Sequence, residues 1–340
     1  MKLQQLRYVL AVAENGLNIT AAAERLHTSQ PAVSKQIRQL EDELGLKLFT
    51  RRGKALTGIT DEGREVVERA EIILREVGNI QRLAQNLKRE DHGLLSIGTT
   101  HTQARYVLPP VISQFRERYG EVSLSMHQGT SEQLAQMVDS GQIDFVIATG
   151  GGDLFPELVR LPCYHWDRVI VVPKEHELAA LGRTPTLAEL ARFPLVTYVF
   201  SERGESSFKR AFADAGLTPN VAFTARDADV IKTYVKMGVG VGVVASMAQS
   251  DADADGLVAV DATGLFPRLT TWLGFRRETV LRNFMYYFIS CMAPHADEWT
   301  IRRALEQGSQ EGVDALFTDV QLPFRGAGGR EVSVPEPVAH

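Results

Sequence analysis

The sequence has 340 residues, a length that predicts two or three domains of ordinary size. Apolar residues make up 44% and charged residues 23%, as in globular proteins. The N-terminus lacks the long apolar stretch that a signal peptide or a membrane span would have. Cys163 and Cys291 are too few for a disulfide framework, and no Cys and His residues have metal-site spacing. We therefore expect a cytoplasmic protein with no membrane partner.

The net charge of −5 is unevenly distributed along the chain. Residues 1–59 hold nine Lys and Arg against five Asp and Glu, a net charge of +4, whereas the remainder holds 28 against 37, a net charge of −9. A basic N-terminal module on an acidic body is typical of a protein that contacts a polyanion with one end only.

Residues 1–59 have the pattern of a small helical domain. Apolar periodicity predicts a first helix over residues 3–13, and Thr20 is expected to cap a short second helix. Ser29 is a natural cap for a third helix, which Gly45 ends. Four apolar residues of that helix, spaced four, three and four apart, form a stripe that we expect to be buried: Val33, Ile37, Leu40 and Leu44.

The opposite face of the third helix is polar, and a charged turn follows it. Gln and Arg can pair with base edges in the major groove of DNA, while Ser and Lys reach phosphates. The charged turn predicts a β-hairpin wing, and together the elements predict a winged helix-turn-helix. The alternative is a three-helix core whose basic face is only solvated. The expected DNA contacts are Ser29, Gln30, Pro31, Ser34, Lys35 and Arg38 on the helix, and Arg51, Arg52 and Lys54 on the wing.

A long linker helix is predicted over residues 60–87, and a polar hinge over residues 88–92. Apolar residues recur at alternating spacings of four and three, which favours a coiled-coil seam between two copies of the chain. Packing of the helix on its own domain is the alternative. The expected dimerisation residues are Val66, Ala70, Ile73, Val77, Ile80, Ala84 and Leu87.

From residue 93, short apolar runs alternate with helical patterns, which predicts an α/β fold with largely parallel sheets. We expect two lobes joined by two crossings of the chain, with lobe I formed by residues 93–162 and 267–305 and lobe II by residues 163–266. Such lobes place a ligand cleft at their interface. The C-terminal segment, residues 306–340, ends in a Gly- and Pro-rich tail that we expect to be disordered.

No motif of the body predicts catalysis or a bound cofactor. Gly240 to Ala245 fits a dinucleotide fingerprint, but that fingerprint needs a strand before the glycines and a helix after them, and here a helical pattern precedes a strand. Nucleophile-elbow, P-loop and metal-spaced carboxylate motifs are missing from the sequence. We therefore assign no catalytic residue, metal or cofactor.

Hydroxyl groups gather where the first strand of the body ends. Thr100 and Thr102 stand between this strand and the following helix, whose free N–H groups and positive dipole end favour an anion. Thr149 ends another strand in the same way, so we expect it at the same cleft. A small oxyanion or carboxylate suits such a site, and simple helix capping is the alternative.

Several short motifs of the first domain stand at fixed spacing: Ala22-Ala23, Ser29-Gln30-Pro31, Leu40-Glu41, Glu43-Leu44-Gly45 and Leu48-Phe49. Their order resembles the N-terminal winged helix-turn-helix of the LysR-type transcriptional regulators. The resemblance implies a homodimer or homotetramer that binds promoter DNA and contacts RNA polymerase, with a two-lobed effector domain like a periplasmic binding protein.

Further motifs lie in the body, among them "TTHTQARYVLPPVI", "LPCYHW" and "GFRR". They resemble the LysR subgroup that contains CysB and Cbl, activators of sulfur assimilation and cysteine biosynthesis. The resemblance implies an anion site lined by Thr100, Thr102, Gln103 and Thr149. It also implies N-acetylserine as the inducer, with sulfate or thiosulfate able to occupy the site.

One stretch departs from this subgroup. Where the subgroup has "FGFTGRS", this chain has "FSERGES", which places Arg203 at the position of an anion-facing threonine. An arginine can bind an anion bidentately, or it can pair with Glu202 or Glu205 and leave the site one hydroxyl short. A regulator of sulfonate or other amino-acid-derivative metabolism therefore stays open, as does a solute receptor or enzyme with a fused helical head.

Overall fold

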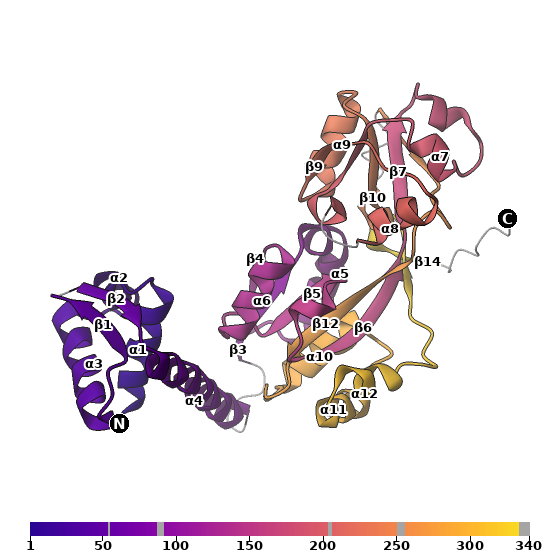
Figure 1. The fold of residues 1–340 in the computed structure, drawn as a ribbon. Helices are drawn as coiled ribbons and strands as arrows, with labels where there is room; N and C mark the ends of the chain where they lie inside the picture. The colour runs from indigo at the N-terminus through magenta and orange to yellow at the C-terminus, as the bar shows by residue number, and fades with distance from the viewer. Residues whose placement is uncertain (54, 87–91, 203–205, 250–255, 333–340) are drawn as a thin grey trace. The chain divides into compact units, whose positions relative to one another are not determined.

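The computed structural model describes residues 1–53, 55–86, 92–202, 206–249 and 256–332. Of the residues singled out above, Lys54, Leu87, Arg203, Glu205, the hinge positions 88–91 and the tail residues 333–340 lie outside these ranges. The chain divides into two compact units, residues 1–89 and 90–340 (Figure 1). Among the described residues, no helix is long and apolar enough to cross a membrane.

The first unit is a winged helix-turn-helix followed by a long helix. Apolar side chains from the helices and from the first wing strand share one core, with Val9, Val33 and Ile37 fully buried. The wing strands pair antiparallel around Gly53, which has a positive φ of 63°. The elements are α1 (Leu3–Glu14), α2 (Ile19–Arg25), α3 (Gln30–Leu44), β1 (Phe49–Arg52), β2 (Ala55–Ile59) and α4 (Asp61–Asn86).

Two details of the helical pattern are corrected. Asn18, and not Thr20, caps α2, because its side-chain oxygen accepts hydrogen bonds from the backbone N–H groups of Thr20 and Ala21 at 3.0 and 3.1 Å. Leu44 is 37% exposed, although the predicted stripe included it. It occupies the last turn of α3, beyond the core contacts that Leu40 makes.

The predicted dimer seam is corrected at the start of α4. Ala70 is 1% exposed and belongs to the core of its own domain, with Val66 packed against the same cluster, because this half of α4 lies against α1. Ala70 is therefore closed to a partner. Ile73 and Ile80 are 36% and 64% exposed, and Val77 and Ala84 are also accessible, so for these four a seam stays a prediction.

In the second unit, lobe I is built on a seven-stranded sheet with the order β14-β13-β6-β12-β5-β3-β4. Its aromatic core includes Phe115, Phe145, Phe275 and Phe288, all fully buried. The strands are β3 (Gly93–Thr99), β4 (Val122–Gln128), β5 (Phe145–Thr149), β6 (Leu158–Trp166), β12 (Leu269–Arg276), β13 (Phe324–Arg325) and β14 (Glu331–Val332). The helices are the π-helix Gln103–Val107, α5 (Leu108–Arg118), α6 (Ser131–Asp139), α10 (Asn283–Met292), α11 (Glu298–Glu306) and α12 (Gln310–Ala315).

Lobe II has a five-stranded sheet with the order β11-β7-β10-β8-β9. Separate apolar clusters cover its two faces, one around Phe208 and Phe212 and the other around Ile231 and Val235. The stretch after Gly240 is a strand, as the sequence predicts. The elements are β7 (Arg168–Pro173), α7 (Leu187–Leu190), β8 (Leu195–Tyr198), α8 (Ser207–Asp214), β9 (Val221–Ala225), α9 (Ala228–Lys236), β10 (Val241–Ala245) and β11 (Leu257–Val260).

Both sheets are mixed rather than largely parallel. Strand β12 returns from lobe II between β5 and β6 and runs antiparallel to both, and β10 and β11 run antiparallel to β7. The two crossings of the chain require such opposed directions. Strand β6 was not predicted, and because it belongs to the lobe I sheet, the lobe boundary moves from residue 163 to Asp167.

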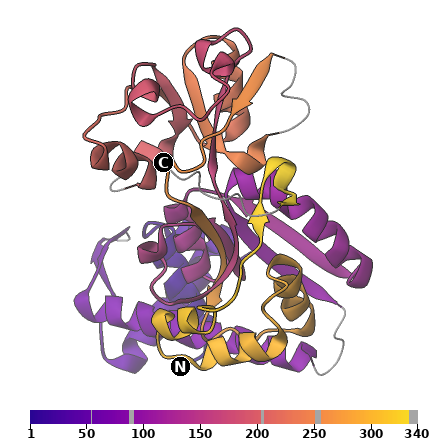
Figure 2. The same cartoon turned by 90° about the vertical axis from the view of Figure 1, so that its right-hand side faces the viewer.

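The expected disorder of the C-terminal tail is corrected for residues 322–332, which we call the C-terminal strap (Figure 2). Phe324 is 4% exposed and joins the sheet beside β6, where the His165 N–H donates to the Pro323 carbonyl at 2.8 Å. The strap also reaches lobe II, because the Gly328 N–H donates to the Gln249 carbonyl at 2.8 Å. A buried aromatic side chain thus orders a segment whose composition indicated a coil.

Candidate functional site

The exposed residues among the DNA contacts predicted on the third helix lie on the outer face of α3. Gln30, Lys35 and Arg38 are exposed, while the stripe that carries Val33 and Ile37 faces the core. Neither Lys35 nor Arg38 forms an ion pair within the part of the chain that the structure describes. Uncompensated cations beside an exposed amide suit phosphate and base contacts.

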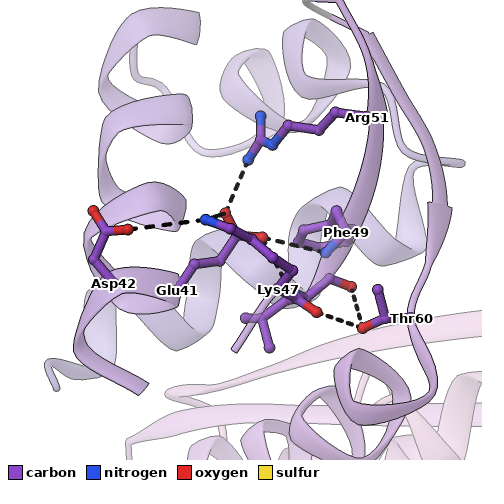
Figure 3. Close-up of polar contacts among 7 residues, drawn as sticks. Glu41, Asp42, Lys47, Phe49, Arg51 and Thr60 are labelled. Carbon is purple, nitrogen blue, oxygen red and sulfur yellow. Dashed lines mark hydrogen bonds and ion pairs between the residues drawn. The ribbon is translucent and has the colours of Figure 1, made fainter. Parts of the chain in front are cut away.

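A buried carboxylate fixes the wing to the end of α3 (Figure 3). Glu41 is 2% exposed, and its Oε1 accepts the backbone N–H groups of Leu48 and Phe49 at 3.0 and 3.3 Å. Its Oε2 lies 3.4 Å from Nη2 of Arg51. Arg51 is therefore partly neutralised, whereas Arg52 next to it is exposed and forms no ion pair among the described residues.

The same region anchors α4. The Thr60 hydroxyl donates to the Lys47 carbonyl at 2.6 Å, which holds the chain before β1 (Figure 3). It also accepts from the Gly63 N–H at 2.9 Å and so caps α4. Thr60 and Glu41 together set the position of the wing. The sequence analysis placed Thr60 at the start of the linker helix and Glu41 in a motif, but it predicted no contact of either residue with the wing.

In lobe I, the structure joins Gln103 and Thr149 through a third residue, Thr271 of β12. Nε2 of Gln103 donates to the Thr271 hydroxyl at 3.2 Å, and the hydroxyls of Thr149 and Thr271 lie 2.7 Å apart. Nε1 of Trp166 lies 3.1 Å from the Thr271 hydroxyl and 3.3 Å from that of Thr149. The Tyr164 hydroxyl donates to the side-chain oxygen of Gln103. These five residues form what we call the lobe I polar network.

Thr102 faces lobe II. Its side chain hydrogen-bonds Tyr198, whose phenol also accepts the Ala245 N–H at 3.1 Å. Burial raises the pKa of Tyr198, and these hydrogen bonds partly offset the rise. Thr102 makes no side-chain capping hydrogen bond, so the alternative of helix capping is wrong for this residue. Thr100 is half-buried at the start of the same helix.

The helix after Thr102 opens into a π-helical turn over Gln103–Val107. Pro109 and Pro110 lack the N–H groups that an α-helix would offer to the carbonyls of residues 105 and 106, which loosens this turn. One of these carbonyls, that of Tyr106, lies against the strap: a Cβ added at Gly329 would lie only 2.0 Å from it. A π-turn at such a position is often associated with a functional site.

A polar latch connects the two lobes. The Tyr106 hydroxyl donates to Oδ1 of Asp229 at 2.7 Å, and Nε of Arg105 lies 2.6 Å from Oδ2 of the same carboxylate. Lys232 is 4% exposed and lies 3.1 Å from Asp229, and it donates to the Ala248 carbonyl at 2.9 Å. The interactions around it hold the pKa of Asp229 below its usual value despite the opposing effect of burial.

His101, Asp227 and Asp229 also come within metal-ligand distance of one another. Asp229, however, is already occupied by two cationic side chains and a phenol, and Asp227 caps α9 through the Val230 N–H. A divalent cation there would meet Arg105 and Lys232. The cluster therefore fits the interlobe latch better than a metal centre.

Four features of this region were not predicted as site residues: Thr271, Tyr164, Trp166 and the latch around Asp229. The motif "LPCYHW" contains two of them, Tyr164 and Trp166, but the family resemblance that it carries implies no role for either residue. Thr271 stands in a strand without neighbouring signals, and only sheet register places it opposite Thr149.

Comparison with known proteins gives the context of these sites. Residues 3–64 match the family "Bacterial regulatory helix-turn-helix protein, lysR family", and residues 88–297 match the "LysR substrate binding domain". The chain is 44% identical to the HTH-type transcriptional regulator CysB of Haemophilus influenzae over 322 residues, covering 95% of this chain and 99% of that protein. It is 45% identical to the HTH-type transcriptional regulator SsuR of Burkholderia cenocepacia over 308 residues, covering 90% and 99%.

A solved structure extends this likeness to the fold of the second unit. The crystal structure of the cofactor-binding domain of the Cbl transcriptional regulator matches with a TM-score of 0.60 at 38% identity, covering 64% of this chain and 95% of that one. The proteins that resemble this sequence and share this two-lobed architecture are thus transcriptional regulators and not enzymes.

Proposed function

The chain belongs to the LysR family of transcriptional regulators, and we propose that it activates genes of sulfur assimilation in response to a small anionic effector held between its lobes. The family membership, expected from the winged-helix motifs, accounts for the DNA-binding head and the two-lobed domain. It also sets aside the alternatives of a solute receptor or an enzyme. The effector and the regulated genes are the new part of the proposal.

The lobe I polar network is the observation that carries the effector proposal. Gln103, Thr149 and Thr271 bring neutral hydrogen-bonding groups together at one end of the lobe I sheet, where they bond to one another, and the N–H groups of the following helix begin beside them. Neutral donors solvate an oxyanion without adding charge. The likeness to CysB and Cbl supports N-acetylserine as the inducer, with sulfate or thiosulfate able to occupy the same place.

An effector acts by favouring one arrangement of the lobes. In this proposal it alters the latch around Asp229, and the altered domain changes the placement of the DNA-binding heads and their contact with RNA polymerase. Pairing through the exposed apolar face of α4 would provide two heads for a two-fold-related site and gain avidity. The proposal places this homodimer or homotetramer in the cytoplasm.

A second candidate effector follows from the departure at Arg203. This residue lies outside the described part of the chain. If it binds the ligand, the preferred anion is a sulfonate or another amino-acid derivative. The likeness to SsuR, which is as close as that to CysB, keeps this alternative in view.

Calorimetric titration of the full chain with N-acetylserine tests the proposal. Thr102→Ala is expected to weaken effector binding while DNA affinity stays near that of the wild type, because Thr102 lies in the effector domain at the lobe boundary. Thr186→Ala, which removes a helix cap in lobe II, is the matched control and leaves the titration unchanged. A collapse of DNA binding in Thr102→Ala would show that the residue is structural.

A further inference from the structure

Arg168, the first residue of β7, is a buried cation that forms no ion pair among the described residues. It is only 4% exposed, and its Nε and Nη1 atoms have no hydrogen-bond partner. The neighbouring carboxylate of Asp167 is engaged with Arg268 at 3.3 Å, and within the described ranges Arg168 forms no ion pair. Buried charges in folded proteins are paired or hydrogen-bonded, so this guanidinium calls for an explanation.

The guanidinium keeps its charge in this environment. Burial lowers the pKa of Arg168 to about 10, which still leaves the side chain protonated at neutral pH. The Phe266 ring centroid lies 5.5 Å from its Cζ and covers one side. A ring face attracts a cation but accepts none of the in-plane N–H groups, so the donors remain unsatisfied.

Sheet register places Arg168 among polar groups of lobe II. It is paired with Ala245 of β10, which puts its side chain on the sheet face that also carries Thr197 of β8. Thr197 is fully buried and its hydroxyl lies 3.3 Å from that of Ser201, which is also fully buried. Tyr198, the residue after Thr197, is the partner of Thr102 in lobe I.

We propose that Arg168 anchors a small oxyanion of the sulfate class in lobe II, as the cationic part of the effector site. This inference rests on the proposed function, which supplies an anion between the lobes. The residues predicted for that site within the described ranges, Thr100, Thr102, Gln103 and Thr149, are all neutral. A planar guanidinium supplies the missing charge and the directional donors that such an anion requires.

The test measures thermal unfolding of the full chain with sulfate at constant ionic strength, together with calorimetric titration of sulfate. Wild type is expected to gain stability with a saturable dependence in the low-millimolar range. Arg168→Met is expected to match or exceed the wild-type midpoint without sulfate, because it removes an unpartnered buried charge, and to lose the sulfate-dependent gain. Arg168→Lys keeps the charge but lacks the paired N–H donors of the planar guanidinium, and it is expected to bind sulfate about tenfold more weakly.

Arg276→Met is the matched control, since Arg276 is also a buried arginine, 7% exposed, and donates to the Val138 carbonyl at 2.6 Å. It is expected to lower the midpoint with and without sulfate and to keep the gain. The proposal is overturned if Arg168→Met and Arg168→Lys retain wild-type sulfate affinity, or if Arg168→Met lowers the midpoint equally in both conditions, as an internally satisfied arginine would. If these two variants keep wild-type sulfate affinity, the role of Arg168 is wrong but the proposed function is unaffected. Absence of saturable binding of both sulfate and N-acetylserine to wild type would contradict both.

Discussion

Replacing Glu41 should detach the wing from α3. The side chain of Glu41 is 1% exposed, and one of its oxygens accepts two backbone N–H groups from residues that are themselves buried. A buried N–H left without an acceptor costs about 1–3 kcal/mol, so Glu41→Ala is expected to destabilise the wing by roughly 2–6 kcal/mol. The ion pair with Arg51 at 3.4 Å is partly exposed and adds at most about 1 kcal/mol.

Glu41→Gln separates the two contributions. The amide oxygen keeps an acceptor for the N–H groups of Leu48 and Phe49 and loses only the charge, so a penalty of about 1–2 kcal/mol is expected. Hydrogen exchange of the amides of residues 48 and 49 is the assay, because it reports local opening in the intact chain. A loss of about 4 kcal/mol corresponds to roughly thousandfold faster exchange.

Asp42→Ala is the control for this measurement. Asp42 is exposed next to Glu41, and its ion pair with Lys47 spans 3.9 Å, so its removal is expected to leave the exchange unchanged. DNA affinity should fall in the order wild type, Glu41→Gln, Glu41→Ala. Equal exchange in Glu41→Ala and wild type, or equal damage by Gln and Ala, would refute the role assigned to the carboxylate.

Arg38→Ala is expected to weaken DNA binding and to reduce its salt slope by about one, measured by anisotropy at several salt concentrations; an unchanged slope contradicts a phosphate or base contact. Thr271→Val should weaken N-acetylserine binding in calorimetry without changing DNA affinity. Gly329→Ala should lower the midpoint of effector-domain unfolding, because φ is +70° and the new Cβ meets the Tyr106 carbonyl. Burial lowers the pKa of His295, so stability should fall as pH drops below about 6.5, less so in His295→Gln.

The outcomes that contradict the last three predictions are equally specific. Wild-type effector affinity in Thr271→Val would mean that the polar network only stabilises lobe I. An unchanged midpoint in Gly329→Ala would mean that the strap adapts without cost. A pH slope that is the same in wild type and His295→Gln would assign the acid sensitivity to other groups.

Local pattern was sufficient for the head and for most elements of the body. Spacing of Val33, Ile37 and Leu40 defined the buried side of α3, and hence its polar side, without any knowledge of long-range contacts. The same reasoning failed for Ala70, because a heptad pattern shows that one face of a helix is apolar but not which surface packs against that face. Ala70 packs into the core of its own domain, although the same position could have packed against a partner helix.

Long-range contacts account for the rest. Thr271 and Thr149 are 122 residues apart in sequence and meet only through the register of β12 and β5. The strap is ordered by Phe324, a single buried side chain in a segment rich in Gly and Pro. Composition alone indicates a coil for such a segment, because the cavity that receives the aromatic ring is formed by other parts of the chain.

The central claim is that an anionic effector between the lobes changes how the heads engage DNA. Its most direct test is the footprint of the full chain on a duplex that the protein selects from a random-sequence pool, recorded with and without N-acetylserine. A two-fold-related footprint whose length or outer contacts change with the effector is the expected result. A footprint that stays identical while N-acetylserine is bound would contradict the claim.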